Sequence, residues 1–125
     1  MNNEELVRRV KASMQKQCGE RGYTAPVDVL IDIGLLTKAN YERWRRGQVD
    51  YLERLCSGTL NKLTLVLREM RVYAQKKGLK PSFTYYGLWG SKKSALRFSK
   101  SGRPEIERWY ATHFVDTEWR KQSKQ

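Results

Sequence analysis

Cysteine and histidine are scarce in this chain of 125 residues, which holds two cysteines, Cys18 and Cys56, and one histidine, His113. The cysteines lie far apart with no CxxC spacing, so the sequence favours neither a disulfide framework nor a Cys/His metal site. It also has no apolar run long enough to cross a bilayer, and residues 1–5 are polar and acidic where a secretory signal is basic and then apolar. We therefore expect a cytoplasmic protein without a membrane segment, a metal or a cofactor.

Acidic residues are few, and the middle of the chain almost lacks them. The sequence has 25 Lys and Arg against 13 Asp and Glu, which gives a formal net charge of +12 and a pI near 10.0. Residues 59–104 hold eleven basic residues and one acid, Glu69, and so carry +10 of this charge, whereas both ends are nearly neutral. A stretch of this kind attracts a polyanion, and we expect it to bind nucleic acid.

Only three prolines interrupt the chain, and most of its length favours helix. The length and the apolar fraction of 39% suit one hydrophobic core, so we expect a single domain over residues 1–119 and a frayed polar tail over 120–125. The most regular helix is predicted between a Thr59 cap and Gly78. Its apolar stripe is Leu60, Leu63, Leu67, Met70 and Ala74. The expected helices cover about residues 3–20, 24–33 with a Thr24 cap, 37–46 with a Thr37 cap, 51–56, 59–77 and 105–114.

Strand-forming residues follow the longest predicted helix. Residues 81–86 are rich in β-branched and aromatic side chains, residues 95–99 alternate apolar with polar, and a basic loop rich in Gly and Ser lies between them. This pattern predicts a hairpin over about residues 82–99. The expected fold class is therefore mainly α with a small β-hairpin.

The order of these predicted parts resembles that of the winged helix-turn-helix DNA-binding superfamily. A short helix at 51–56, a Ser57-Gly58 turn, a longer helix at 59–77 and a hairpin with a basic tip follow one another over about residues 50–102. The segment Leu96-Arg97-Phe98-Ser99-Lys100-Ser101-Gly102 resembles the second wing strand and its exit. The resemblance implies a winged-helix-like domain whose longer helix lies in the DNA major groove while the wing reaches the backbone or the minor groove.

A polar stripe of the helix 59–77 lies about a third of a turn from its apolar stripe and contains no acid. Its side chains suit base edges, because Arg bonds guanine, Asn and Gln bond adenine, and Thr contacts the thymine methyl. A solvated helix face of the same composition is the alternative. The candidate base-contacting residues are Asn61, Thr64, Arg68, Arg71 and Gln75.

Cations and aromatic rings alternate along the predicted hairpin and beyond it. The cations can neutralise phosphates or simply keep an edge strand soluble. The rings can stack on bases, as in single-strand binders, or pack against the helices. The candidate backbone contacts are Lys92, Lys93, Arg97, Lys100 and Arg103, and the candidate stacking rings are Tyr85 and Trp89. A further pair of cations, Arg45 and Arg46, lies at the C-terminal end of the helix predicted over residues 37–46. The helix dipole favours cations there, which is the simplest explanation of the pair, and a phosphate contact is the alternative.

The sequence therefore predicts a small, non-enzymatic nucleic-acid-binding protein that acts on duplex DNA as a regulator or an architectural factor. Two alternatives use the same basic surface: a structured-RNA or ribosome-binding protein, and a protein-interaction module that docks an acidic partner. No nucleotide-binding or hydrolase motif is present. A small nuclease built on a carboxylate pair such as Asp28 and Asp32 has no short signature and stays open.

The first predicted helix adds an expectation about assembly. Its apolar residues recur every fourth position, which makes one long stripe: Leu6, Val10, Met14 and Cys18. Many helix-turn-helix proteins dimerise to bind two half-sites. The stripe is therefore a candidate surface for a homodimer.

Overall fold

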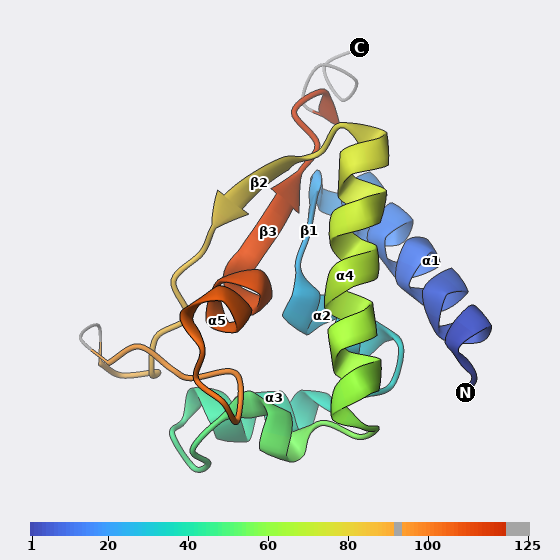
Figure 1. The fold of residues 1–125 in the computed structure, drawn as a ribbon. Helices are drawn as coiled ribbons and strands as arrows, with labels where there is room; N and C mark the ends of the chain where they lie inside the picture. Colours follow the sequence, from blue (N-terminus) through green and yellow to red (C-terminus); the bar gives the residue numbers. More distant parts are fainter. Residues whose placement is uncertain (92–93, 120–125) are drawn as a thin grey trace.

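The computed structural model describes residues 1–91 and 94–119 and groups helices around a small antiparallel sheet (Figure 1). In these residues the α-helices are α1 (Asn3–Arg21), α2 (Pro26–Asp32), α3 (Lys38–Arg45), α4 (Leu60–Lys77) and α5 (Pro104–Ala111). The short elements are the 3-10 helix η1 (Leu52–Leu55) and the strands β1 (Tyr23–Thr24), β2 (Lys80–Phe83) and β3 (Thr112–Val115). A mainly helical chain with a small antiparallel β element is thus confirmed. No helix in the described ranges is long and apolar enough to span a membrane.

Local signals at the helix ends locate the longest helices. The Asn2 side chain accepts a hydrogen bond from the Glu5 amide at 2.8 Å and so begins α1. Thr59 does the same for α4, which ends at Gly78 in the left-handed conformation with φ 67°. The predicted bounds of α4 are confirmed, but Leu60 is 62% exposed and does not belong to the core stripe.

Two of the predicted short elements are corrected. Residue 24 does not cap α2, because Thr24 lies in β1 and its hydroxyl donates to the Gln17 side-chain oxygen at 2.8 Å. The segment before α4 is a 3-10 helix of four residues instead of an α-helix over 51–56. Both segments are too short for an apolar period to define them.

The sheet differs from the predicted hairpin in its pairing. β3 lies in the middle and pairs antiparallel with β1 on one side and β2 on the other. The last helix therefore ends at Ala111 and not near Phe114, because Thr112–Val115 is extended between two strands. The predicted partner of β2, residues 95–99, contributes only an isolated bridge between Gly87 and Ala95.

The core lies between the parallel pair α1 and α4 and the sheet with α2 and α5 (Figure 1). Leu6, Val10 and Met14 of α1 are at most 1% exposed within this core. Three of the four residues of the stripe that suggested a homodimer are thus covered by the chain's own helices, and the fourth, Cys18, is partly buried.

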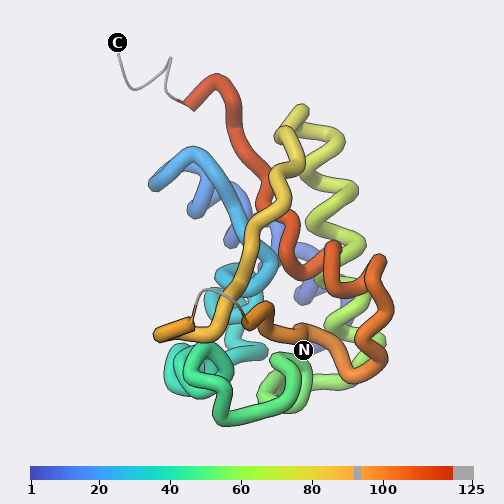
Figure 2. Tube along the Cα trace, turned by 90° about the vertical axis from the view of Figure 1, so that its left-hand side faces the viewer, coloured from blue at the N-terminus to red at the C-terminus, as the bar shows by residue number. Residues whose placement is uncertain are grey.

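A second part of the core is aromatic and joins α3 to α5. The Trp44 and Phe98 ring centroids are 5.0 Å apart, and Phe98 stacks on Tyr110 at 5.4 Å. The Trp44 indole N–H donates to the Arg97 carbonyl oxygen at 2.8 Å. Figure 2 shows the chain after β2 (yellow) running down to this end of the molecule beside α3. The cluster holds the segment between β2 and α5 against the helices.

Candidate nucleic-acid interface

The outer face of α4 presents most of the predicted base-contacting side chains to solvent. Four of the five are exposed: Asn61, Thr64, Arg68 and Gln75. The fourteen residue steps from Asn61 to Gln75 span about 21 Å along the helix axis. Figure 1 shows α4 in front of α2 and β1, with α1 on one side and α5 on the other. The nearest acid is Glu69, whose carboxylate lies 3.5 Å from the Arg68 guanidinium and whose side chain is only 17% exposed.

Arg71 departs from this exposed face. Its guanidinium carbon lies 4.0 Å from the centroid of the Trp109 ring of α5. Its Nη1 atom is buried without a hydrogen-bond partner. Burial lowers the pKa of Arg71, and the charge of Arg68 lowers it further. Arg71 therefore ties α4 to α5 and is less available to a ligand than Arg68.

A groove runs between α4, α5 and the loop at residues 99–103 and encloses about 730 Å³. It brings together two predicted sets, since Thr64 from the base-contacting set lines it with Lys100 and Arg103 from the backbone-contacting set. Its remaining lining is apolar and acidic: Leu60, Leu67, Ile106, Trp109, Glu53 and Glu105, with Ser99 and Ser101. Arg103 pairs with Glu105 at the rim. The groove thus combines an apolar lining with two cations, Lys100 and Arg103, and two carboxylates, Glu53 and Glu105.

Two carboxylates fix the loop that carries these cations. Glu107 accepts hydrogen bonds from the amides of Phe98 at 2.8 Å and Ser99 at 2.7 Å, and from the Ser99 hydroxyl at 2.6 Å. Glu53 accepts from the Lys100 amide at 2.9 Å and from the Tyr110 hydroxyl at 2.6 Å. Desolvation, followed by this hydrogen bond to Glu53, raises the pKa of Tyr110. The loop is therefore held in place before any ligand arrives.

The other predicted backbone contacts differ in position. The Arg97 guanidinium donates to the Ser99 carbonyl at 2.8 Å and to the Lys100 carbonyl, and so helps to hold the loop. Its guanidinium carbon also lies 5.3 Å from the Tyr51 ring centroid. Lys92 and Lys93 lie outside the described residues.

Aromatic rings and arginines gather at the C-terminal end of α3. The Trp89 amide donates to the Arg45 carbonyl at 2.8 Å, and the guanidinium carbons of Arg45 and Arg46 lie 5.3 and 5.7 Å from the Trp89 ring centroid. Both predicted stacking residues are exposed, Tyr85 to 53% and Trp89 to 43%. Phe83, exposed to 67%, was not among them, although it alternates with Tyr85 in the sequence.

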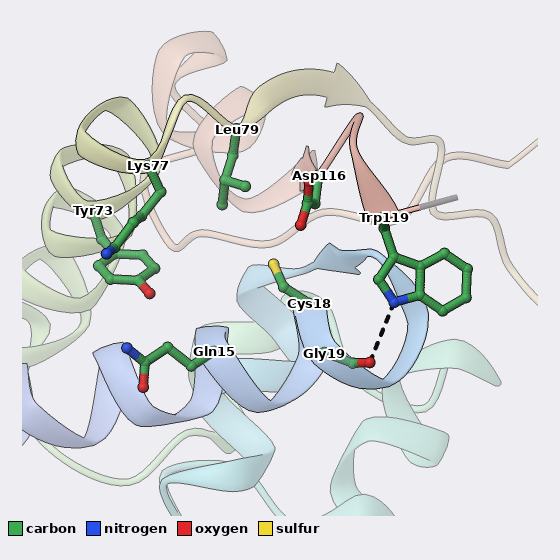
Figure 3. A pocket seen from close by; sticks show the side chains of 8 residues that line it. All are labelled: Gln15, Cys18, Gly19, Tyr73, Lys77, Leu79, Asp116 and Trp119. Carbon is green, nitrogen blue, oxygen red and sulfur yellow. Dashed lines mark hydrogen bonds between the residues drawn. The ribbon is translucent and has the colours of Figure 1, made fainter. Parts of the chain in front are cut away.

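A second hollow, of about 510 Å³, lies where α1 and α4 end (Figure 3). Lys77 lines it from α4, while Asp116 and Trp119 line it from the segment after β3 (Figure 3). The Trp119 indole donates to the Gly19 carbonyl at 3.2 Å. The Cys18 thiol faces this hollow (Figure 3), but burial raises its pKa, so it is a poor nucleophile.

The carboxylate pair that suggested a nuclease is occupied by protein contacts. Asp28 pairs with Arg21 at 2.7 Å, and Asp32 accepts from Ser13 at 2.7 Å and Gln17 at 2.9 Å. Among residues 1–91 and 94–119, no three His, Cys, Asp or Glu side chains gather as a metal site requires. The Asp28 and Asp32 carboxylates are thus engaged by neighbouring side chains.

Comparisons of the chain with protein-family models, with curated proteins and with solved structures give no match in any of the three.

Proposed function

We propose that this protein binds duplex DNA through the outer face of α4 and the adjoining groove, as a non-enzymatic cytoplasmic regulator or architectural factor. The observation that supports this most is the groove itself, where Thr64 of α4 faces the same space as Lys100 and Arg103. Groups suited to base edges and groups suited to phosphates therefore meet at one place.

The dimensions of α4 suit this role. A B-DNA major groove about 12 Å wide admits an α-helix, and the exposed side chains from Asn61 to Gln75 lie along one side of α4. With α4 in the DNA major groove, Lys100 and Arg103, which line the same hollow as Thr64, can reach the phosphates of an adjacent strand. The loop is held by Glu53 and the α5 residue Glu107, so binding costs little ordering of the chain.

The winged helix-turn-helix arrangement is the finer part of the proposal. The 3-10 helix η1 and α4 follow one another across the Ser57-Gly58 turn in the order that the resemblance requires. In this proposal the segment that follows β2 corresponds to the wing, and an isolated bridge joins Gly87 to Ala95 within it. In this proposal the fixed loop at residues 99–103 takes over much of the wing's contact with phosphates.

Arg68 gives the sharpest test of the site. A preferred duplex is first selected from a random pool, and the affinity of the whole protein is then measured on that duplex and on random DNA. Arg68→Ala should cost about 1–3 kcal/mol on the preferred duplex and much less on random DNA, because base contacts carry discrimination. Arg8→Ala, which removes the same charge from an exposed position of α1, is the matched control and should leave the preference intact.

Three outcomes would contradict this proposal. Equal losses on every sequence for both variants would mean that α4 is part of a general polyanion surface. Tight binding of structured RNA with no preference among duplexes would favour the RNA-binding alternative, and binding of neither nucleic acid would favour an acidic protein partner.

A further inference from the structure

The chain from Phe83 to Trp89 exposes three large aromatic side chains. Phe83, Tyr85 and Trp89 are 67%, 53% and 43% exposed, whereas Tyr86 between them is 9% exposed. Residues 83–86 continue the line of β2 toward α3 (Figure 2), and Trp89 lies in a turn that follows the bridge between Gly87 and Ala95. Alternate side chains of an extended segment point to the same side. We call Phe83, Tyr85 and Trp89 the aromatic row.

The row is held in shape by its own backbone and neighbours. The Leu96 amide donates to the Tyr86 carbonyl at 2.9 Å, and the Leu88 amide donates to the Ser94 carbonyl at 2.9 Å. The Tyr85 ring lies so close to Gly87 that a Cβ atom there would stand 2.7 Å from the ring carbon Cε1. These contacts hold two of the rings without burying them.

Cations flank both ends of the row. Arg46, whose side chain is 55% exposed, lies beside Trp89, and its only close acid among the described residues is Glu42 at 3.8 Å. At the other end, Phe83 and Tyr85 line a hollow of about 290 Å³ together with Arg108. The acid in that hollow is Glu107, which is engaged by Phe98 and Ser99.

Three exposed rings between arginines have the composition of a surface that binds unpaired bases. Every base has a face that stacks on an aromatic ring, and arginines beside the rings neutralise the strand's phosphates. Alternate side chains along an extended segment lie about 6.8 Å apart, twice the rise of about 3.4 Å per nucleotide in one strand. A base therefore has room between the Phe83 and Tyr85 rings. A duplex offers no such faces, because its bases are already stacked.

We propose that the aromatic row, with Arg46 and Arg108, is a second binding surface of this protein and that its ligand is single-stranded nucleic acid. This surface lies outside the groove of α4 and takes another form of nucleic acid, so the inference does not rest on the duplex site. Bases stack on Phe83 and Tyr85 at one end and on Trp89 at the other. The two arginines hold the phosphates that run between them.

The test measures the affinity of the whole protein for a labelled oligothymidine of about 20 nucleotides, with a duplex of equal length as the comparison. Phe83→Ala should weaken oligothymidine binding by roughly five- to 150-fold, the range for the loss of one stacked base. Phe83→Trp keeps a ring at the same place and should retain the affinity. Neither change should alter duplex affinity by more than about twofold.

A second variant moves a ring without removing one. Gly87→Ala should displace Tyr85 and weaken oligothymidine binding several-fold, while the fold stays intact because a side chain yields more easily than backbone. Gly19→Ala adds the same methyl group where no atom lies within 4 Å and is the matched control.

The outcomes separate this inference from the duplex site. Weaker binding of the preferred duplex by Arg68→Ala, with oligothymidine binding unchanged, would support two surfaces. Oligothymidine affinity that is unchanged in both Phe83→Ala and Gly87→Ala would overturn the inference. The absence of any oligothymidine binding by the unchanged protein would also overturn it and would leave a protein partner as the occupant of the row.

Discussion

Replacing Glu107 tests whether a fixed loop presents Lys100 and Arg103 to the ligand. Its two oxygens accept three hydrogen bonds, one at Oε1 from the Phe98 amide and two at Oε2 from Ser99. At about 1 kcal/mol for each bond, Glu107→Ala should lower the free energy of unfolding by about 3 kcal/mol. Glu107→Gln keeps an oxygen for Ser99 but turns its NH2 group toward the Phe98 amide, and it should cost about 1 kcal/mol.

Two hypotheses predict opposite effects of Glu107→Ala on duplex binding: that the loop acts only through its net charge, and that it must be held in place. Removing Glu107 makes the protein more positive, so charge alone predicts tighter duplex binding. If the loop must be held in place, Glu107→Ala should instead weaken duplex binding at a fixed salt concentration, because Lys100 loses its position beside the groove. Glu105→Gln is the matched control, since it removes the same charge from α5 without a bond to the loop backbone, and it should bind as well as the unchanged protein or better.

Stability is followed by circular dichroism in urea, and binding by the fluorescence anisotropy of a labelled duplex. The reasoning fails if Glu107→Ala unfolds at the same urea concentration as the unchanged protein. It also fails if Glu107→Ala and Glu105→Gln tighten duplex binding equally, because the loop would then act through its net charge alone.

Three further predictions concern single groups. Gly22→Ala should lower the free energy of unfolding, measured in urea, by about 1–2 kcal/mol. Gly22 has φ 80°, and a Cβ atom there would lie 2.9 Å from the Trp119 ring. An unchanged free energy of unfolding would contradict that packing. Burial raises the pKa of Cys56 to about 12, so iodoacetamide at pH 8 should label it far more slowly in the folded protein than in urea. Burial also lowers the pKa of His113, although the nearby Asp28 acts in the opposite direction. Because His113 binds a proton more readily in the unfolded chain than in the folded protein, the free energy of unfolding should fall as the pH drops below 6.5. That decline should be smaller in His113→Gln, and an equal decline would exclude His113 as its source.

The sequence predicts the helices well where each end carries its own signal. Thr59 and Gly78 are local marks of α4, and the burial of Leu63 and Met70 follows from their spacing alone. Leu60 belongs to the same stripe but lies in the first turn, where the apolar side faces the groove and not the core. Whether the end of a stripe is covered depends on the elements that pack there.

The sheet could not be predicted, because its partners lie far apart in the sequence. β2 follows α4 closely, yet it pairs with Thr112–Val115 and not with the nearer residues 95–99. A β-branched and aromatic pattern favours a strand in each of these segments and does not name its partner. Thr112, Phe114 and Val115 are strand-forming residues, but they directly follow an amphipathic helix. The apolar pattern of that helix led the predicted helix to continue beyond Ala111.

The candidate site shows the same division between local and distant contacts. The exposure of Asn61 and Arg68 follows from the period of α4. The contact of Arg71 with Trp109 of α5 depends on a helix that begins more than 30 residues later, and no pattern within α4 indicates it. The meeting of Thr64 with Lys100 likewise required the loop to be folded back by Glu53 and Glu107.

The salt dependence of duplex binding tests the central proposal most directly. Affinity for one duplex is measured between about 50 and 200 mM salt for the unchanged protein and for the double variant Lys100→Ala, Arg103→Ala. With about six phosphates neutralised, the logarithm of the affinity should fall against the logarithm of salt with a slope of roughly −5, and the double variant should be shallower by roughly two. A slope near zero in the unchanged protein, or the same slope in both, would contradict the proposal that these cations hold the DNA backbone beside α4.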